Sequence, residues 1–215
     1  MLLTVPVFAV DYPKVEVFGG YSLIRADLKD LEDVEFYEGA EVYIPEYDVY
    51  GYISNVETSK LLEKGFIGSF TYNITSAIGI EAAFRYNSGD VINFDMTIPG
   101  EGSGSAAVKL RGIAFGAGPK FTFRNDSILT PFAHALVGFD DMKMDIHASA
   151  AGVSAEEEFD SHTGFGLTLG GGLDLEVSDN VALRVVQADY YMSRHFEETQ
   201  NNFVFSFGVV FGFGE

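Results

Sequence analysis

Four side chains of this sequence have the chemistry from which a hydrolase could be built: Asp160, Ser161, His162 and His195. Such an enzyme needs a nucleophilic hydroxyl, a general base and an acid that orients the base, all within hydrogen-bond reach. Ser161 and His162 are adjacent, and neighbouring side chains of a strand point to opposite faces. The spacing therefore disfavours catalysis, and we expect a protein that is not an enzyme.

Carboxylates crowd two predicted loops and could in principle hold a hard cation such as Ca²⁺ or Mg²⁺. They are Asp27, Asp30, Glu32, Asp33, Glu35, Glu38, Glu41, Glu46, Asp48 and Glu57 in one loop, and Asp141, Asp145, Glu156, Glu157, Glu158 and Asp160 in the other. Neither set matches the D-x-[DN]-x-[DN]-G spacing of a calcium loop, and runs of charge are usually solvated. We expect anionic loops, with no metal site and no cofactor.

The composition excludes several classes of protein. A net charge of −19 repels phosphate backbones, so we expect no nucleic-acid partner, and the lack of Cys excludes disulfides and Cys-ligated zinc. No stretch approaches the roughly 18 consecutive apolar residues that a membrane-spanning helix needs. If the chain crosses a membrane, strands must do so, and its 24 Gly, 20 Phe and 11 Tyr favour strands.

The first nine residues, MLLTVPVFA, resemble the apolar end of a secretion signal, with Val7 and Ala9 at the −3 and −1 positions of a cleavage site. We therefore divide the chain into a signal remnant at 1–9 and a single domain at 10–215.

Eight segments alternate apolar and polar residues with the period of a β-strand, and each is close to the roughly 9 to 11 residues that a tilted spanning strand needs. They are Lys14–Arg25, Lys64–Ile74, Ile78–Asn87, Lys109–Phe123, Leu129–Asp140, Gly164–Glu176, Val181–Met192 and Asn202–Phe213. Short turns at 75–77, 124–128 and 177–180 alternate with long links at 26–63, 88–108, 141–163 and 193–201. The sequence thus predicts an all-β, eight-stranded antiparallel up-and-down barrel with its short turns at one end and its long loops at the other.

The volumes of the two alternating faces predict which one meets lipid. One face carries most of the Phe, Tyr, Val and Ile, including Phe66, Phe70, Phe84 and the aromatic residues of the last strand. An eight-stranded barrel has barely enough room inside for its own side chains, so these rings must point outward. The other face is small or polar, which suits a narrow lumen. The alternative is a soluble lipocalin-like barrel, in which the apolar residues point inward.

Charged residues of both signs fall on the inward face, where they need partners. They are Glu16, Glu81, Arg85, Lys120, Asp174 and Arg184, and we expect ion pairs among them to plug the lumen. Asp174 and Arg184 face each other if the hairpin centres on Asp179. Simple alternation would turn Gln187 and Asp189 to lipid. Either a β-bulge near Val185 and Val186 restores their inward direction, which we prefer, or Asp189 lies above the hydrocarbon layer.

The segments KVEVFGGYSLIR, LTPFAHALVGFDD, GFGLTLGGGLDLEVSDNVALRVVQADYYMSR and NNFVFSFGVVFGFG together resemble the OmpA-like outer-membrane β-barrel domain family. The resemblance implies a small monomer in the bacterial outer membrane, in contact with its lipids and inserted by the outer-membrane assembly machinery. In this family that machinery reads alternating aromatic residues in the final strand. The matching residues are Phe205, Phe207, Val209, Phe211 and Phe213.

The family's barrel serves many activities, so function must be sought in the loops. The Tyr-rich stretch EVYIPEYDVYGY, with Tyr43, Tyr47, Tyr50 and Tyr52, is the surface-contact region that we expect, because Tyr is enriched in binding surfaces. Our first hypothesis is a non-enzymatic envelope scaffold or surface-contact protein with a plugged lumen. The alternatives are a narrow pore for ions or small solutes and a rim-sited lipid hydrolase.

Overall fold

The computed structural model describes residues 12–26, 39–44, 49–100, 102–150, 153–158, 161–195 and 198–214. Their strands are β1 (Val15–Arg25), β2 (Glu41–Ile44), β3 (Val49–Thr58), β4 (Leu61–Leu62), β5 (Lys64–Asn73), β6 (Ile78–Ile98), β7 (Gly102–Thr122), β8 (Leu129–Ala150), β9 (Val153–Glu158), β10 (His162–Ser178), β11 (Val181–His195) and β12 (Glu198–Phe213). None of the described residues forms a helix long and apolar enough to cross a membrane.

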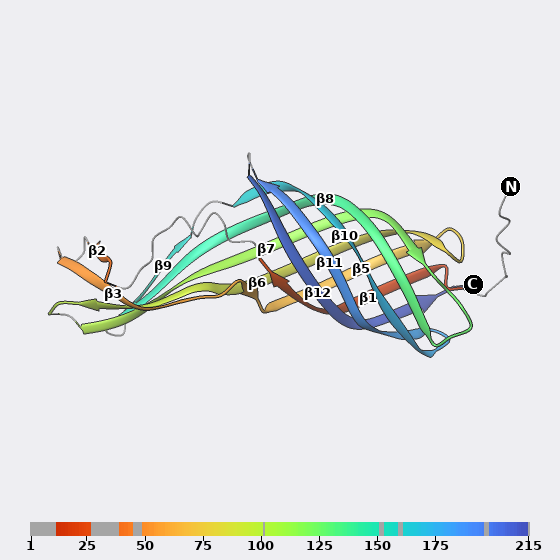
Figure 1. The fold of residues 1–215 in the computed structure, drawn as a ribbon, viewed down its shortest axis with the longest axis horizontal. Helices are drawn as coiled ribbons and strands as arrows, with labels where there is room; N and C mark the ends of the chain where they lie inside the picture. Colours follow the sequence, from red (N-terminus) through yellow and green to blue (C-terminus); the bar gives the residue numbers. More distant parts are fainter. Residues whose placement is uncertain are drawn as a thin grey trace.

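Eight of these strands close into a barrel in which each pairs antiparallel with its neighbours in the chain: β1, β5, β6, β7, β8, β10, β11 and β12. The pairing of β1 with β12, from Val15 opposite Phe213 to Arg25 opposite Phe203, closes the ring. The prediction of an eight-stranded up-and-down barrel is confirmed. Both ends of the described chain lie at the short-turn end of the barrel (Figure 1).

Most bulky apolar residues point away from the barrel axis, whereas Phe18, Ile67 and Phe132 are buried inside it. Phe66, Phe70, Phe139 and Phe207 have exposed fractions of 53%, 49%, 67% and 50%. Their inward neighbours Ser69, Thr71, Asp140 and Ser206 are polar and buried. Some Gly positions are required for close approach of neighbouring strands, since a Cβ atom on Gly138 would lie 1.9 Å from the carbonyl oxygen of Phe115.

Three strands continue far beyond the barrel, which the sequence did not predict. The links expected at 88–108 and 141–163 are largely strand, because β6, β7 and β8 keep pairing up to Ile98, Gly102 and Ala150. The link at 26–63 contributes β2, β3 and β4. Together β2, β3, β6, β7, β8 and β9 form a twisted open sheet that projects from one end of the barrel (Figure 1).

The strand boundaries predicted at Asn87, Lys109 and Asp140 are therefore wrong. Beyond them the alternation persists, with Ile92, Phe94 and Ile98 in β6 and Met142, Met144 and Ile146 in β8, whereas the facing segment of β7 at 102–107 consists of Gly, Ser and Ala. Inward-facing Ile92, Phe94 and Val108 are buried and form an apolar core that supports the projecting sheet. Backbone pairing and this core are sufficient to extend the strands beyond the barrel, although they have no band of lipid-facing apolar residues there.

Candidate functional site

Arg184 is the centre of an ionic network that fills the barrel lumen. Its guanidinium donates two hydrogen bonds to Asp174, from Nε at 2.8 Å and from a terminal nitrogen at 3.0 Å, in the bidentate geometry typical of strong Arg–carboxylate pairs. The same guanidinium lies 4.2 Å from the ring centroid of Phe18 and 4.0 Å from that of Phe132. Two aromatic faces and one carboxylate thus hold a cation that is 1% exposed.

The β11 strand places Arg184 and its neighbours through a β-bulge. Arg184 pairs with Gly208 and Gln187 with Ser206, so Val185 and Val186 together oppose a single residue of β12. Both valines are exposed, whereas Gln187 and Asp189 are 1% and 2% exposed. The preferred reading of this segment, a bulge that turns Gln187 and Asp189 inward, is confirmed.

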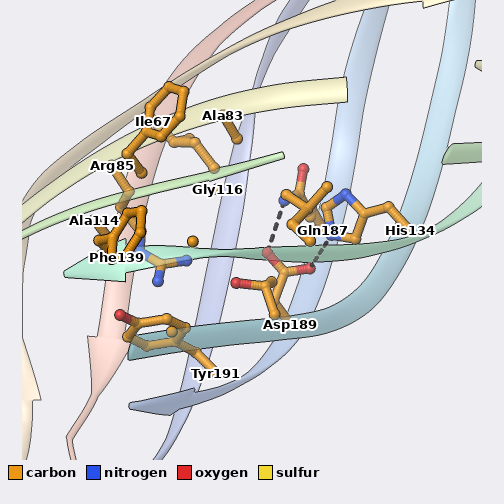
Figure 2. Close-up of a pocket in the computed structure, with 15 residues that line it drawn as sticks. Ile67, Ala83, Arg85, Ala114, Gly116, His134, Phe139, Gln187, Asp189 and Tyr191 are labelled. Atoms are coloured by element: carbon orange, nitrogen blue, oxygen red, sulfur yellow. Dashed lines mark hydrogen bonds and ion pairs between the residues drawn. The ribbon is translucent and has the colours of Figure 1, made fainter. Parts of the chain in front are cut away.

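A chain of hydrogen bonds leads from Arg184 across the lumen to the opposite wall, and Figure 2 shows its middle part, from Gln187 through Asp189 to His134. Arg184 donates to Gln187 Oε1 at 2.7 Å, and Gln187 Nε2 donates to Asp189 Oδ2 at 2.7 Å. His134 lies between two carboxylates, with Nε2 3.0 Å from Asp189 Oδ1 and Nδ1 2.9 Å from Glu81 Oε2. Carboxylates accept hydrogen bonds, so both contacts form together only when both ring nitrogens carry a proton.

A second ionic cluster lies toward the short-turn end and centres on Glu16. Lys120 Nζ donates to Glu16 Oε2 at 2.6 Å, and Asn73 Nδ2 donates to Glu16 Oε1 at 2.9 Å. Arg124, which follows β7, also pairs with Glu16. Lys120 lies 4.9 Å from the ring centroid of Phe132, whose ring therefore contacts the cations of both clusters.

Arg85 lies on the other side of the network, toward the projecting sheet. Its guanidinium is 4.3 Å from the ring centroid of Tyr191, and both side chains are buried. Arg85, His134, Gln187, Asp189 and Tyr191 line a cavity of about 20 Å³ (Figure 2). That volume holds about one water molecule.

The lumen charges balance when His134 is included. Among the described residues, the buried carboxylates of the lumen are Glu16, Glu81, Asp140, Asp174 and Asp189, and its permanent cations are Arg85, Lys120, Arg124 and Arg184. Five negative charges and four positive charges leave one negative charge, which an imidazolium at His134 cancels. Buried charges are tolerated when they are paired and hydrogen-bonded, so this balance suits a static filling.

Above the ionic network the interior becomes apolar. Ile24, Leu62, Val91, Leu110 and Val204 are buried together at the base of the projecting sheet. The barrel is thus filled by charged side chains in its middle and by apolar side chains at the end from which the sheet projects.

The Tyr residues expected to contact a partner lie on the hairpin of β2 and β3. Tyr43 pairs with Tyr50 and Glu41 with Tyr52 in its backbone ladder. Tyr50 and Tyr52 are 55% and 46% exposed. The side chain of Tyr43, and Tyr47 altogether, lie outside the described residues.

Beside this hairpin, the sheet is hollowed by a groove of about 580 Å³ between β3, β6, β7 and β8. Asn55, Glu57, Asn93, Asp95 and His147 contribute polar side chains to its lining. Asn55 has a positive φ of 51° and donates a hydrogen bond from Nδ2 to Asp95 at 2.8 Å. The lining also includes Phe94 and Ala106, so the groove adds a concave surface of mixed polarity to the exposed tyrosines.

Only two of the four residues considered for hydrolysis lie wholly in the described part of the chain. Ser161 and His162 are exposed, while Asp160 and the side chain of His195 lie outside the described residues. Most carboxylates of the expected acidic loops, and the predicted signal remnant at 1–9, also lie outside them. Among the described residues, no group of three or more His, Asp or Glu side chains is arranged to hold a metal ion.

The residues of the predicted assembly signal follow β12 on its outer face. Phe205, Phe207, Phe211 and Phe213 are between 46% and 53% exposed, and Val209 is half-buried.

Sequence reasoning missed the participation of Arg124, Asp140 and Tyr191 in the lumen, and it does not identify Glu81 and Asp189 as the partners of His134. Arg124 was placed in a turn, although it reaches back into the lumen. The strand register, known only from the closed barrel, places His134 between Glu81 and Asp189.

The chain matches a protein-family model over nearly its whole length. A model of the outer membrane protein beta-barrel domain matches residues 1–213. Among solved structures, the chain is similar to Ail, the attachment invasion locus protein of Yersinia pestis, with 15% identity, 94% of this chain and 100% of that chain covered, and a TM-score of 0.49.

Two further structures are similar at the same level. For OprG from Pseudomonas aeruginosa the identity is 9%, the coverage 95% and 97%, and the TM-score 0.45. For the Neisserial surface protein A these values are 15%, 93%, 96% and 0.44. None of the curated proteins compared with the chain matches it.

Proposed function

Because this chain belongs to the family of outer membrane proteins with a beta-barrel domain, we propose that it is a non-enzymatic barrel with a plugged lumen, whose extracellular sheet makes it an envelope scaffold or surface-contact protein. The observation that carries the proposal is the filled lumen, where the cavity beside Arg85 and His134 measures about 20 Å³. Barrels of this kind place their short turns in the periplasm, so the projecting sheet faces the cell exterior.

The sheet supports the surface-contact role because its paired strands hold exposed side chains in an ordered surface. Tyr50 and Tyr52 are exposed on a paired hairpin, and the groove beside them has both polar and apolar side chains in its lining. Tyr is enriched in binding surfaces because one end of the ring is apolar and the other donates a hydrogen bond. A strand-built surface also loses less conformational entropy on binding than a disordered loop does.

Assembly and processing complete the proposal. The barrel is a monomer in contact with outer-membrane lipids, and the assembly machinery reads the outward residues of β12 that end at Phe213. The mature chain begins near Val10. N-terminal sequencing of membrane-extracted protein tests the start, and light scattering in detergent tests the monomer.

Planar-bilayer recording of the full chain tests the plug. We expect no stable unitary steps from the unmodified protein, because ion pairs and apolar residues fill the lumen. Replacing two filling cations, Lys120→Gly with Arg184→Gly, should produce measurable current if the barrel still folds. Leu183→Ala, at a lipid-facing neighbour, is the matched control. Stable steps from the unmodified protein that change with Arg85→Ser would refute the plug and favour a narrow pore.

Complementation tests the role of the sheet. In cells that lack the protein, the full chain should restore resistance to detergent and adhesion to surfaces. A variant in which a short Gly–Ser link replaces residues 39–59 should fold, as judged by its mobility on unheated gels, but fail in adhesion. Full restoration of both properties by this trimmed variant would show that the hairpin is not needed.

A further inference from the structure

The groove between β3, β6, β7 and β8 continues along β7 into a second hollow. The first part measures about 580 Å³ and the second about 600 Å³, and both linings include Asn55, Asp95, Ser105 and Ser149. On β6 the linings reach from Asn93 to Thr97. That distance, four residues of a strand, is about 14 Å. The groove is therefore long enough for about four residues of an extended polypeptide.

The strand register places the polar side chains of the groove on one face of the sheet. Asp95 of β6 lies opposite Ser105 of β7, and Asn93 lies opposite Ala107. Ala107 in turn lies opposite His147 of β8. Directly opposed residues, and residues two apart on one strand, project from the same face. The small side chains of Ser105 and Ala107 therefore form a floor between the larger side chains of β6 and β8.

Two carboxylates in the lining, Glu57 and Asp95, are exposed to solvent. Glu57 pairs with Asn93, and Asp95 lies two residues from Asn93 on β6. The two carboxylates thus belong to levels of the sheet that are about 7 Å apart along the strands. In an extended polypeptide, side chains two residues apart lie on the same side with this same spacing. The carboxylates match the positions of two such side chains.

A β-bulge in β3 positions one of these carboxylates. Between Ser54 and Glu57, Asn55 and Val56 together oppose the single residue at 94 of β6. Asn55 has a φ of 51°, and its Nδ2 donates a hydrogen bond to Asp95 Oδ2 at 2.8 Å. A carboxylate has two oxygens and about four acceptor positions, so Asp95 can accept further hydrogen bonds from a bound partner.

The charge of the surrounding surface is negative. The described segments of the projecting sheet at 41–44, 49–58, 91–100, 102–108, 146–150 and 153–158 contain no Lys or Arg. The next basic residues along the chain are Lys60 and Lys109, which lie outside the lining of the groove. Because charge complementarity selects partners and speeds their encounter, this surface attracts cationic partners and repels anionic ones.

We propose that the groove binds an extended, basic segment of another polypeptide, in which two Lys or Arg side chains two residues apart pair with Glu57 and Asp95. The amide of Asn93 and the hydroxyl of Ser105 supply donors and acceptors for the backbone of that segment. The spaced carboxylates favour this occupant over a neutral glycan, which has no charge to pair with them. This inference rests on the surface-contact role proposed above and specifies the chemistry of the partner.

Fluorescence anisotropy of the full chain in neutral detergent, at physiological ionic strength, tests the spacing of the charges. The probes are two end-labelled synthetic peptides, TKTKT and TTKKT, which have the same composition and charge. Adjacent Lys side chains of an extended chain point to opposite sides, so TTKKT can place only one of them in the groove. TKTKT should bind about threefold more tightly, as expected for one additional exposed ion pair.

Three variants, each checked for folding by its mobility on unheated gels, locate the site. The double variant Glu57→Gln, Asp95→Asn should bind TKTKT about tenfold more weakly and should no longer distinguish the two peptides. Its matched control is Glu63→Gln, Asp90→Asn, which removes two exposed carboxylates outside the lining and should change binding less than twofold. Ser105→Tyr fills the floor without changing any charge and should also weaken binding about tenfold.

Equal binding of the two peptides by the unmodified protein, or equal losses in the two charge variants, would overturn the proposal in favour of diffuse attraction. Binding of the neutral trisaccharide maltotriose that Ser105→Tyr abolishes, without a preference between the peptides, would assign the groove to a glycan instead. In the adhesion assay, full adhesion by cells with Glu57→Gln, Asp95→Asn would overturn this inference alone. The surface-contact role itself fails only if the variant trimmed at 39–59 also adheres.

Discussion

Replacing Arg184 by Met tests whether the lumen is a dry, closely paired interior. The substitution keeps much of the side-chain volume between Phe18 and Phe132 but removes both hydrogen bonds to Asp174 and the one to Gln187. Asp174, 7% exposed, would be left as a buried carboxylate without its cation. Removing one partner of a buried ion pair typically costs about 3–5 kcal/mol of folding free energy, and we expect a loss of that size.

Urea unfolding in lipid vesicles, followed by circular dichroism, measures this loss. The double variant Arg184→Met, Asp174→Leu should recover most of it, because replacing a buried pair by apolar residues is often neutral. Leu183→Met, on the lipid-facing side of the same strand, should change stability by less than about 0.5 kcal/mol, as surface substitutions usually do. A loss below about 1 kcal/mol for Arg184→Met would contradict the reasoning, because it would mean that water already solvates Asp174.

Three further predictions concern other parts of the barrel. His134→Leu should destabilise the protein by about 3–5 kcal/mol in the same unfolding assay, because Glu81 and Asp189 lose their shared partner, and adding Glu81→Gln should restore part of the loss. Gly138→Val should sharply reduce the yield of folded barrel on unheated gels, because its Cβ would lie 1.9 Å from a carbonyl oxygen of the neighbouring strand; a normal yield would mean that β7 and β8 can separate. Phe213→Ala should lower the amount of assembled protein in outer-membrane fractions severalfold while refolding in detergent is unchanged, and an equal loss in both would assign Phe213 to stability instead of assembly.

The sequence predicted most of the barrel because the lipid outside and the narrow lumen inside impose a simple alternating pattern of side chains. Lipid selects large apolar residues on one face, and a narrow lumen selects small or polar residues on the other, so Phe66 and Phe207 could be oriented from alternation and volume alone. Opposition of Asp174 and Arg184 followed from counting residues around one short turn, and it agrees with the observed register. Local pairing of this kind needs no knowledge of the rest of the chain.

The projecting sheet could not be predicted in the same way. Above the lipid the outward residues are polar, as Asn93, Asp95 and Thr97 are, so the alternation of buried Ile92, Phe94 and Ile98 does not produce the outward apolar band that identified the spanning strands. Their strands persist because β6, β7 and β8 continue to hydrogen-bond to one another and bury Ile92, Phe94 and Val108. Both effects depend on partners that are distant in the sequence.

The sequence by itself determined the class of fold, the number of spanning strands, the outward and inward faces and the identity of most inward charges, because each of these depends on a period of two residues and on side-chain volume. Only the tertiary structure decided which charges meet, since ring closure sets the register between strands far apart in the chain. That register brings His134 between Glu81 and Asp189, turns Arg124 toward Glu16, and sets Glu57 and Asp95 along one groove of the projecting sheet. Alternation specifies the face on which a side chain lies, whereas its neighbour on that face depends on backbone pairing across the whole barrel.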